Sequence, residues 1–218
     1  MLSMKVKICG ITNLEDARFA IKNGADALGF LVDVPEASEI KRITKKAAKN
    51  IISQVPKNIW TFVLTISKNY LDIINLCREL NCTHVQIIED IPSKDLIKIK
   101  NSIPNLKIVK AICVTSKSAI SKAVRYSKVS DYILLDSRIK GQRGGTGKTH
   151  NWVISEEIVK TINKPVFLAG GLSPDNVESA ISKVKPFGVD VDTKLEKEPG
   201  KKDYDKVREF IKIAKNKV

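Results

Sequence analysis

Two side chains that can gain or lose a proton each end an apolar run of the sequence. Cys9 comes directly after Val6-Lys7-Ile8, and Asp136 comes directly after Ile133-Leu134-Leu135. Catalytic groups of α/β barrels lie at the carboxyl ends of strands, so this position makes both residues catalytic candidates. Most free cysteines are small buried hydrophobes, and a loop carboxylate often caps a helix. Position alone therefore leaves a structural role open for each.

A glycine-rich segment, Gly141 to Thr149, follows Asp136 and invites comparison with a nucleotide-binding P-loop. That motif requires a glycine five residues before Gly147, where this chain has Gln142. We therefore expect a loop that covers the substrate, with Gly145 as a substrate contact, rather than a nucleotide site.

Gly170-Gly171 follows a further apolar run and precedes Leu172-Ser173-Pro174, which we interpret as a helix opening. Backbone N–H groups at a helix start bind anions, and barrels often bind phosphate with the loops after strands seven and eight. We expect Gly170 and Gly171 to bind a phosphate, and Asp190 and Thr193, further along the chain, to be substrate contacts as well. The glycines could also serve only a tight turn.

The candidate site residues are set in a regular sequence pattern. Short β-branched runs alternate with longer stretches of helical period, and the pattern repeats about every 25 residues. Several runs are apolar nearly throughout, which is typical of a parallel sheet buried on both faces. The eight predicted strands are Lys5–Cys9, Ala27–Leu31, Trp60–Ile66, His84–Ile88, Lys107–Val114, Tyr132–Asp136, Val166–Ala169 and Gly188–Asp192.

We expect a helix after each strand and one domain, residues 1–218, folded as a single (β/α)8 TIM barrel. An open doubly wound sheet is the alternative, but no dinucleotide-binding fingerprint follows the first strand. Helix starts are predicted at Asn13, with Asp16 three residues later, at Ser155, and at Ser173-Pro174.

Composition excludes several classes of protein. Lys and Arg number 38 against 24 Asp and Glu, for a formal charge of +14, but the lysines are dispersed and no basic stripe alternates with aromatics. We therefore expect no nucleic acid as partner, although a basic nucleic-acid-binding protein is kept as an alternative. No apolar run has the length of a signal peptide or a membrane span, which predicts a cytoplasmic protein without a membrane partner. Four cysteines without paired spacing and two histidines predict neither disulfides nor a metal site.

The motifs taken together identify a family. The chain resembles phosphoribosylanthranilate isomerase of tryptophan biosynthesis over nearly its whole length. The resemblance rests on Lys7-Ile8-Cys9-Gly10-Ile11-Thr12, Gly24-Ala25-Asp26-Ala27-Leu28-Gly29-Phe30, Leu134-Leu135-Asp136, Gly144 to Thr149 with Trp152, Leu168-Ala169-Gly170-Gly171-Leu172 with Asn176-Val177, Gly188-Val189-Asp190-Val191 and Pro199-Gly200-Lys201-Lys202-Asp203.

The resemblance implies an Amadori rearrangement of N-(5-phosphoribosyl)anthranilate to 1-(2-carboxyphenylamino)-1-deoxyribulose 5-phosphate. It implies general acid/base catalysis without metal or organic cofactor: Asp136 protonates the ribose ring oxygen, and Cys9 removes the C2 proton. A small phosphorylated substrate is then the expected partner, and the chain is expected to act as a monomer or homodimer.

Three segments depart from the family pattern. After the second strand, Lys41 lies nearest the place of a substrate-binding arginine, with Arg42 next to it, so both are candidate substrate contacts. Glu89-Asp90 replaces a histidine-glycine pair, and Asp192-Thr193-Lys194 replaces small serines and a glycine. We expect the Asp192 carboxylate to turn to a basic neighbour such as Lys194. These departures also leave open a divergent relative that binds or isomerises another phosphorylated ligand.

Overall fold

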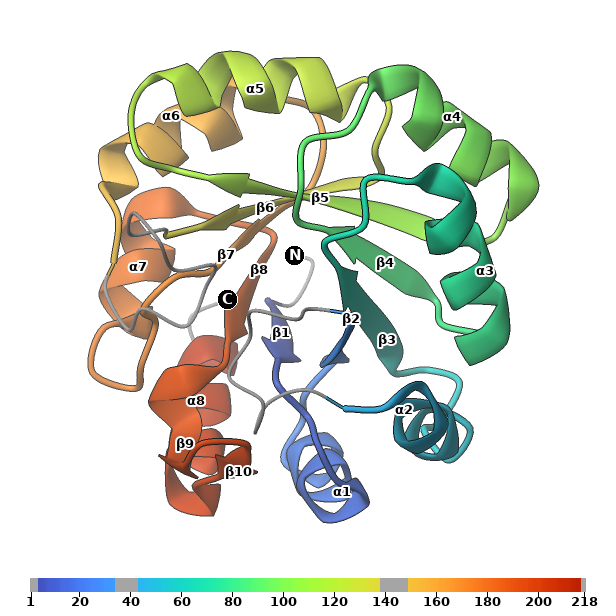
Figure 1. Ribbon diagram of the computed structural model, residues 1–218. Helices are drawn as coiled ribbons and strands as arrows, with labels where there is room; N and C mark the ends of the chain where they lie inside the picture. The colour runs from blue at the N-terminus through green and yellow to red at the C-terminus, as the bar shows by residue number, and fades with distance from the viewer. Residues whose placement is uncertain (1–3, 34–42, 138–148, 217–218) are drawn as a thin grey trace.

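The computed structural model describes residues 4–33, 43–137 and 149–216. Eight parallel strands, β1 to β8, pair in chain order, and β8 also pairs with β1, so the sheet is a closed barrel. In Figure 1, which looks along the barrel, the helices form a ring outside the strands. Closure confirms the predicted (β/α)8 TIM barrel and excludes the open doubly wound sheet.

All eight predicted strands are present, with ends within two residues of those expected. They are β1 (Lys5–Ile8), β2 (Ala27–Asp33), β3 (Trp60–Thr65), β4 (His84–Ile87), β5 (Lys107–Cys113), β6 (Tyr132–Asp136), β7 (Val166–Leu168) and β8 (Gly188–Val191). The helices are α1 (Leu14–Lys22), α2 (Lys45–Ile52), α3 (Tyr70–Leu80), α4 (Ser93–Ser102), α5 (Ser118–Ser127), α6 (Trp152–Thr161), α7 (Val177–Val184) and α8 (Tyr204–Lys215).

Successive side chains of each strand point to opposite faces of the sheet, so the barrel has two separate hydrophobic cores. Val6 and Ile8 of β1 belong to the large cluster between strands and helices. Cys9 belongs to a second cluster with Phe62 and Leu134, which fills the barrel interior. Burying each large apolar side chain contributes roughly 1.5–3 kcal/mol to folding. The interior is therefore a packed core rather than an open channel.

The predicted helix starts were correct at one of three places. Asn13 caps α1, since its Oδ1 accepts a hydrogen bond from the Asp16 amide at 2.8 Å. The prediction at Ser155 was wrong, because Asn151 caps α6 and Ser155 lies inside that helix with its Oγ 2.6 Å from His150 Nε2. The prediction at Ser173-Pro174 was also wrong: a turn comes first, and α7 begins at Val177.

A small antiparallel hairpin that the sequence pattern did not predict follows β8. A 3-10 turn, η1 (Thr193–Leu195), leads into β9 (Glu196–Glu198) and β10 (Lys201–Lys202) before α8 begins. Figure 1 places this hairpin beside α8, outside the barrel. Strands of two or three residues are too short to show a period in the sequence. The hairpin matters because it returns Lys202 toward the end of β8.

Three further observations concern the described ranges alone. None of their helices combines the length and hydropathy that crossing a membrane requires. Their four cysteines form no disulfide; Cys9 and Cys77 are buried, and Cys82 and Cys113 are partly exposed. Within the same ranges, no three His, Cys, Asp or Glu side chains are grouped so that they could hold a metal ion.

Candidate active site

Cys9 and Asp136 lie at the same end of the barrel. Cys9 directly follows β1, its amide donates to the Val191 carbonyl at 2.8 Å, and it is 5% exposed. Asp136 is the last residue of β6, and its Oδ1 accepts a hydrogen bond from the Ser137 amide at 2.7 Å. The eight barrel strands are parallel, so both side chains belong to the carboxyl end, where barrel enzymes carry their catalytic groups.

A buried ion pair inside the barrel lies next to both residues. Lys7 of β1 and Asp190 of β8 are register partners, and Lys7 Nζ lies 2.9 Å from Asp190 Oδ1. Lys7 is completely buried and Asp190 is 7% exposed. The ammonium also lies 5.2 Å from the centroid of the Phe62 ring. The pair thus places one positive and one negative charge in the barrel core, where both act on Cys9 and Asp136.

The pKa of Asp136 is raised to about 7, chiefly because its carboxyl is withdrawn from water and also because Asp190 and Asp192 are negatively charged. A hydrogen bond from the Ser137 amide and the charge of Lys7 oppose this rise. Near neutral pH, Asp136 therefore exists in part as the carboxylic acid, which is the form that can donate a proton.

The pKa of Cys9 is raised to about 12. Burial is the largest cause, and the charges of Asp190 and Asp192 add to it, while Lys7 lowers the pKa. Burial also raises the pKa of Asp190, against the opposing effect of Lys7. Lys7 itself has a raised pKa: burial lowers it, but Asp190 and Cys9 outweigh that effect. The structure therefore holds Cys9 as a thiol and Lys7 as an ammonium ion at neutral pH.

Gly29 on the neighbouring strand β2 leaves the room in which these two groups meet. A Cβ at Gly29 would lie 2.6 Å from Cys9 Sγ and 2.9 Å from Lys7 Nζ. Both distances are shorter than real Cβ atoms show. The Cys9 thiol and the Lys7 ammonium thus lie on either side of the space next to Gly29. The side chain of any other residue at position 29 would fill that space.

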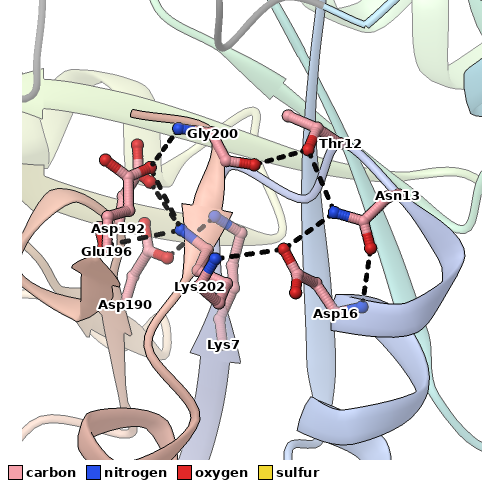
Figure 2. Close-up of polar contacts among 9 residues, drawn as sticks. All are labelled: Lys7, Thr12, Asn13, Asp16, Asp190, Asp192, Glu196, Gly200 and Lys202. Carbon is pink, nitrogen blue, oxygen red and sulfur yellow. Dashed lines mark hydrogen bonds and ion pairs between the residues drawn. The ribbon is translucent and has the colours of Figure 1, made fainter. Parts of the chain in front are cut away.

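The loop after β8 carries a second buried lysine. Lys202 of β10 is 2% exposed, and its Nζ lies 2.8 Å from Asp192 Oδ1 and 3.4 Å from Glu196 Oε1. Figure 2 shows Lys202 between these carboxylates and Asp16 of α1, which accepts a hydrogen bond from the Lys202 amide at 3.1 Å. Lys202, not Lys194, is therefore the cation paired with Asp192. Lys194 is exposed.

The Asp192 carboxylate lies over Gly10, which follows Cys9. A Cβ at Gly10 would be only 2.3 Å from Asp192 Oδ1, and Gly10 has a φ of +70°, which other residues rarely adopt. Close by, Thr12 Oγ1 donates to the Gly200 carbonyl at 2.6 Å (Figure 2). The loop after β1 is thereby held against the loop after β8.

The double glycine after β7 has the backbone that only glycine adopts readily: Gly170 has a φ of +83° and Gly171 a φ of +68°. A Cβ at Gly170 would lie 2.5 Å from the Ser137 amide nitrogen, so this loop packs against the end of β6. The Gly171 carbonyl accepts from Asn176 Nδ2 at 3.0 Å. Since α7 begins only at Val177, the expected helix start does not directly follow the glycines.

The altered segment after β4 turns partly away from the barrel interior. Asp90 lies 2.5 Å from Lys122 Nζ of α5 and 3.7 Å from Lys110 Nζ of β5. Glu89 lies 3.6 Å from Lys68 Nζ. The two added carboxylates are thus accompanied by lysines from neighbouring elements.

The described residues contain only part of the site that the sequence predicted. The structure brings together Cys9, Asp136 and Asp190 and places Thr193 in η1 after β8. Lys41, Arg42 and Gly145 lie outside the described residues. Residues of this site that sequence reasoning did not single out are Lys7, Gly10, Gly29 and Lys202. For Lys7 a signal existed, because a lysine two residues before Cys9 shares its inward face.

Comparisons with known proteins agree with this architecture. Residues 6–213 match the family described as N-(5'-phosphoribosyl)anthranilate (PRA) isomerase. N-(5'-phosphoribosyl)anthranilate isomerase of Bacillus cereus (strain B4264) is 40% identical over 212 residues, 97% of this chain and 98% of the relative.

Solved structures give the same result. Phosphoribosyl anthranilate isomerase from Thermotoga maritima is 34% identical, with a TM-score of 0.87 over 98% of this chain and 99% of that one. A second structure of such an isomerase, 32% identical with a TM-score of 0.84 and the same coverage, holds reduced 1-(o-carboxyphenylamino)-1-deoxyribulose 5-phosphate. On sequence and structure together, this chain belongs to the phosphoribosylanthranilate isomerase family.

Proposed function

We propose that this chain catalyses the Amadori rearrangement of N-(5-phosphoribosyl)anthranilate to 1-(2-carboxyphenylamino)-1-deoxyribulose 5-phosphate, a step of tryptophan biosynthesis. The observation that carries the proposal is the placement of Cys9 and Asp136 at one barrel mouth in a chain of this family. The ligand of the solved relative is a reduced form of the proposed product, which supports the assignment of the substrate.

In this proposal Asp136 is the general acid. It donates its proton to the ribose ring oxygen as the bond from C1 to that oxygen breaks, which leaves an open-chain Schiff base. A carboxyl with a pKa of about 7 retains enough of its acidic form to do this near neutral pH. An ordinary exposed aspartate, with a pKa of about 3.9, would be almost fully ionised.

Cys9 is the general base. Its thiolate removes the proton from C2: the C2–H bond breaks, an S–H bond forms, and the electron pair moves toward the Schiff-base nitrogen. The resulting enolamine tautomerises to the ketone product. Because the pKa of Cys9 is about 12, only a small fraction of the enzyme holds the thiolate at neutral pH.

The substrate phosphate is proposed to bind the backbone of Gly170 and Gly171, with Thr193 of η1 offering its hydroxyl or amide. Asp192 would repel a phosphate, but its carboxylate is paired with Lys202. Lys41, Arg42 and Gly145 are proposed as further substrate contacts, and Asp190 acts through its ion pair with Lys7. We further propose that residues 1–218 form one domain that works as a monomer or homodimer in the cytoplasm.

The test is a fluorescence assay that follows consumption of the anthranilate adduct by the purified protein. Loss of adduct fluorescence, with appearance of the aminodeoxyribulose phosphate, supports the proposal. A protein that binds the reduced product analogue without turning over the adduct would contradict it. That second outcome would favour the alternative, a divergent relative that binds another phosphorylated ligand. The feature that motivates this alternative is Asp192, which stands where the family has a small serine.

A further inference from the structure

Burying the charged side chain of Lys7 in the barrel interior costs free energy. It is completely buried, and so is most of its partner Asp190. Withdrawing two charges from water costs several kcal/mol per ion, and a pair of apolar residues of similar volume often serves stability as well or better. Stability of the fold therefore gives little reason to place an ammonium ion at this point.

The geometry gives another reason. Lys7 and Cys9 are two residues apart on one strand, so both side chains face the barrel interior. Cys9 Sγ and Lys7 Nζ flank the same point beside Gly29, 2.6 Å and 2.9 Å from it. A positive charge at this range favours the ionised form of a neighbouring thiol.

The other charged groups around Cys9 come from three elements. Asp190 at the end of β8 and Asp192 directly after it both disfavour a thiolate at Cys9. Lys202 of β10 interacts with Cys9 as well, but it is bound to Asp192 and Glu196. Asp136 of β6 shares the neighbours Lys7, Asp190 and Asp192 with Cys9. Two carboxylates thus oppose ionisation of the thiol, and Lys7 opposes them from inside the barrel.

We propose that Lys7 is a positioning residue whose buried ammonium stabilises the thiolate form of Cys9 and so sets how much of the enzyme carries an active base. This inference rests on the proposed function, since it gives Cys9 the role of general base. Asp190 has two effects: it holds Lys7 in place and keeps it protonated, and its own charge opposes the thiolate. Lys7 need not touch the substrate.

The test measures the thiolate directly, without turnover. The rate at which iodoacetamide alkylates Cys9 follows the thiolate fraction, and peptide mass spectrometry separates Cys9 from Cys77, Cys82 and Cys113. In Lys7→Met the rate at pH 8 should fall by at least about tenfold, since an adjacent charge shifts a pKa by about one unit or more. In Asp190→Asn it should rise, because a negative neighbour is removed while Lys7 remains.

A purely structural role of the Lys7–Asp190 ion pair would not change the alkylation rate of Cys9 in opposite directions in the two variants. If the ion pair only held the barrel together, both variants would loosen the fold and expose Cys9, so both would react faster. Cys77, which is 3% exposed in α3, reports such loosening in the same digest and should stay unreactive. Should Lys7→Met fail to fold, Asp190→Asn decides through Cys77: faster alkylation of Cys9 with Cys77 still unreactive supports the inference, whereas faster alkylation of both cysteines shows a loosened fold and counts against it.

Lys110→Met is the matched control. Lys110 of β5 is also completely buried, but its Nζ donates to the carbonyls of Ile88 and Ala111, at 3.0 Å and 2.6 Å, and pairs with Asp90 rather than with groups beside Cys9. Its removal should leave the alkylation rate of Cys9 unchanged. Unchanged Cys9 reactivity in Lys7→Met, or slower reaction in Asp190→Asn, would overturn the inference. A wild-type enzyme inactive on the adduct would instead count against the proposed function, whatever the alkylation rates.

Discussion

The ammonium of Lys202 lies 2.8 Å from the carboxylate of Asp192, ten residues earlier in the chain, and closes the loop that follows β8. Both residues lie outside the barrel strands. The same ammonium lies 3.4 Å from Glu196, so two carboxylates share one buried cation. Removing the cation and removing one carboxylate should therefore have unequal effects.

We expect Lys202→Met to destabilise the protein by about 3 to 5 kcal/mol, because it leaves carboxylates without their buried partner. Asp192→Ser should cost clearly less, since Glu196 still pairs with Lys202. Urea unfolding of both variants measures the difference. Equal losses would show that Glu196 does not support Lys202 in this way.

The proposed acid and base should each be needed for turnover but not for binding. Cys9→Ala and Asp136→Asn should lower kcat by roughly 10² to 10⁴, the usual contribution of one general acid or base. Affinity for the reduced product analogue, measured by titration calorimetry, should change little. Near-normal kcat in either variant would remove that residue from the mechanism.

The pH dependence of kcat/KM follows from the two pKa values. In the proposed mechanism, the productive enzyme has Asp136 protonated and Cys9 ionised. Below a pH of about 7, the pKa of Asp136, the thiolate fraction rises tenfold per pH unit while Asp136 stays protonated. Between about 7 and about 12, the pKa of Cys9, each gain in thiolate is matched by a loss of protonated Asp136.

We therefore expect kcat/KM to rise with pH up to about 7 and then to stay level. A decline between pH 7 and 9 would mean that Cys9 is already ionised near neutrality. The raised pKa of Asp136 also affects stability: the folded chain binds this proton more tightly than the unfolded chain, so the contribution of Asp136 to stability falls as pH rises from about 4 to about 7.

Gly10 should not tolerate a side chain. Gly10→Ala forces a left-handed backbone on a residue with a Cβ, which costs about 1 to 2 kcal/mol, and pushes that Cβ against Asp192. Combining it with Asp192→Ser should remove the steric part and leave the backbone part. Thermal unfolding of the single and double variants tests this. If Gly10→Ala lowers the unfolding temperature as much in the Asp192→Ser background as in the wild type, the contact with Asp192 is not the cause.

Phosphate recognition is tested at Gly171, where a side chain would obstruct an oxygen approaching the backbone. Gly171→Ala should weaken inhibition by inorganic phosphate several-fold. Gly24→Ala is the control: Gly24 also has a positive φ, of +99°, but its Cβ would make only an ordinary contact, 3.6 Å from Ile211. Both variants place a Cβ on a backbone with positive φ. Equal phosphate inhibition in the two would argue against a phosphate site at Gly171.

Much of the fold could be predicted from local pattern. The eight apolar runs and their even spacing predicted the strands, because a strand buried on both faces must be apolar over its whole length. The position of Cys9 and Asp136 at the ends of such runs placed them at the barrel mouth, since parallel strands share one carboxyl end. The short hairpin after β8 and the start of α7 were missed. There, hydrogen bonds such as the one from the Ser173 amide to Asn176 outweigh the propensity of Ser173-Pro174 to begin a helix.

The electrostatics of the site depended on the tertiary structure. Lys7 and Asp190 are 183 residues apart and meet only because the barrel closes between β1 and β8. Asp192 finds Lys202 rather than its sequence neighbour Lys194 because the hairpin folds back. Ionisation of a buried group depends on how deeply it is buried and on the charges within a few ångströms. The spacing of residues along the sequence determines neither of these. The sequence therefore names the proposed acid and the proposed base, while closure of the barrel decides which charges act on them.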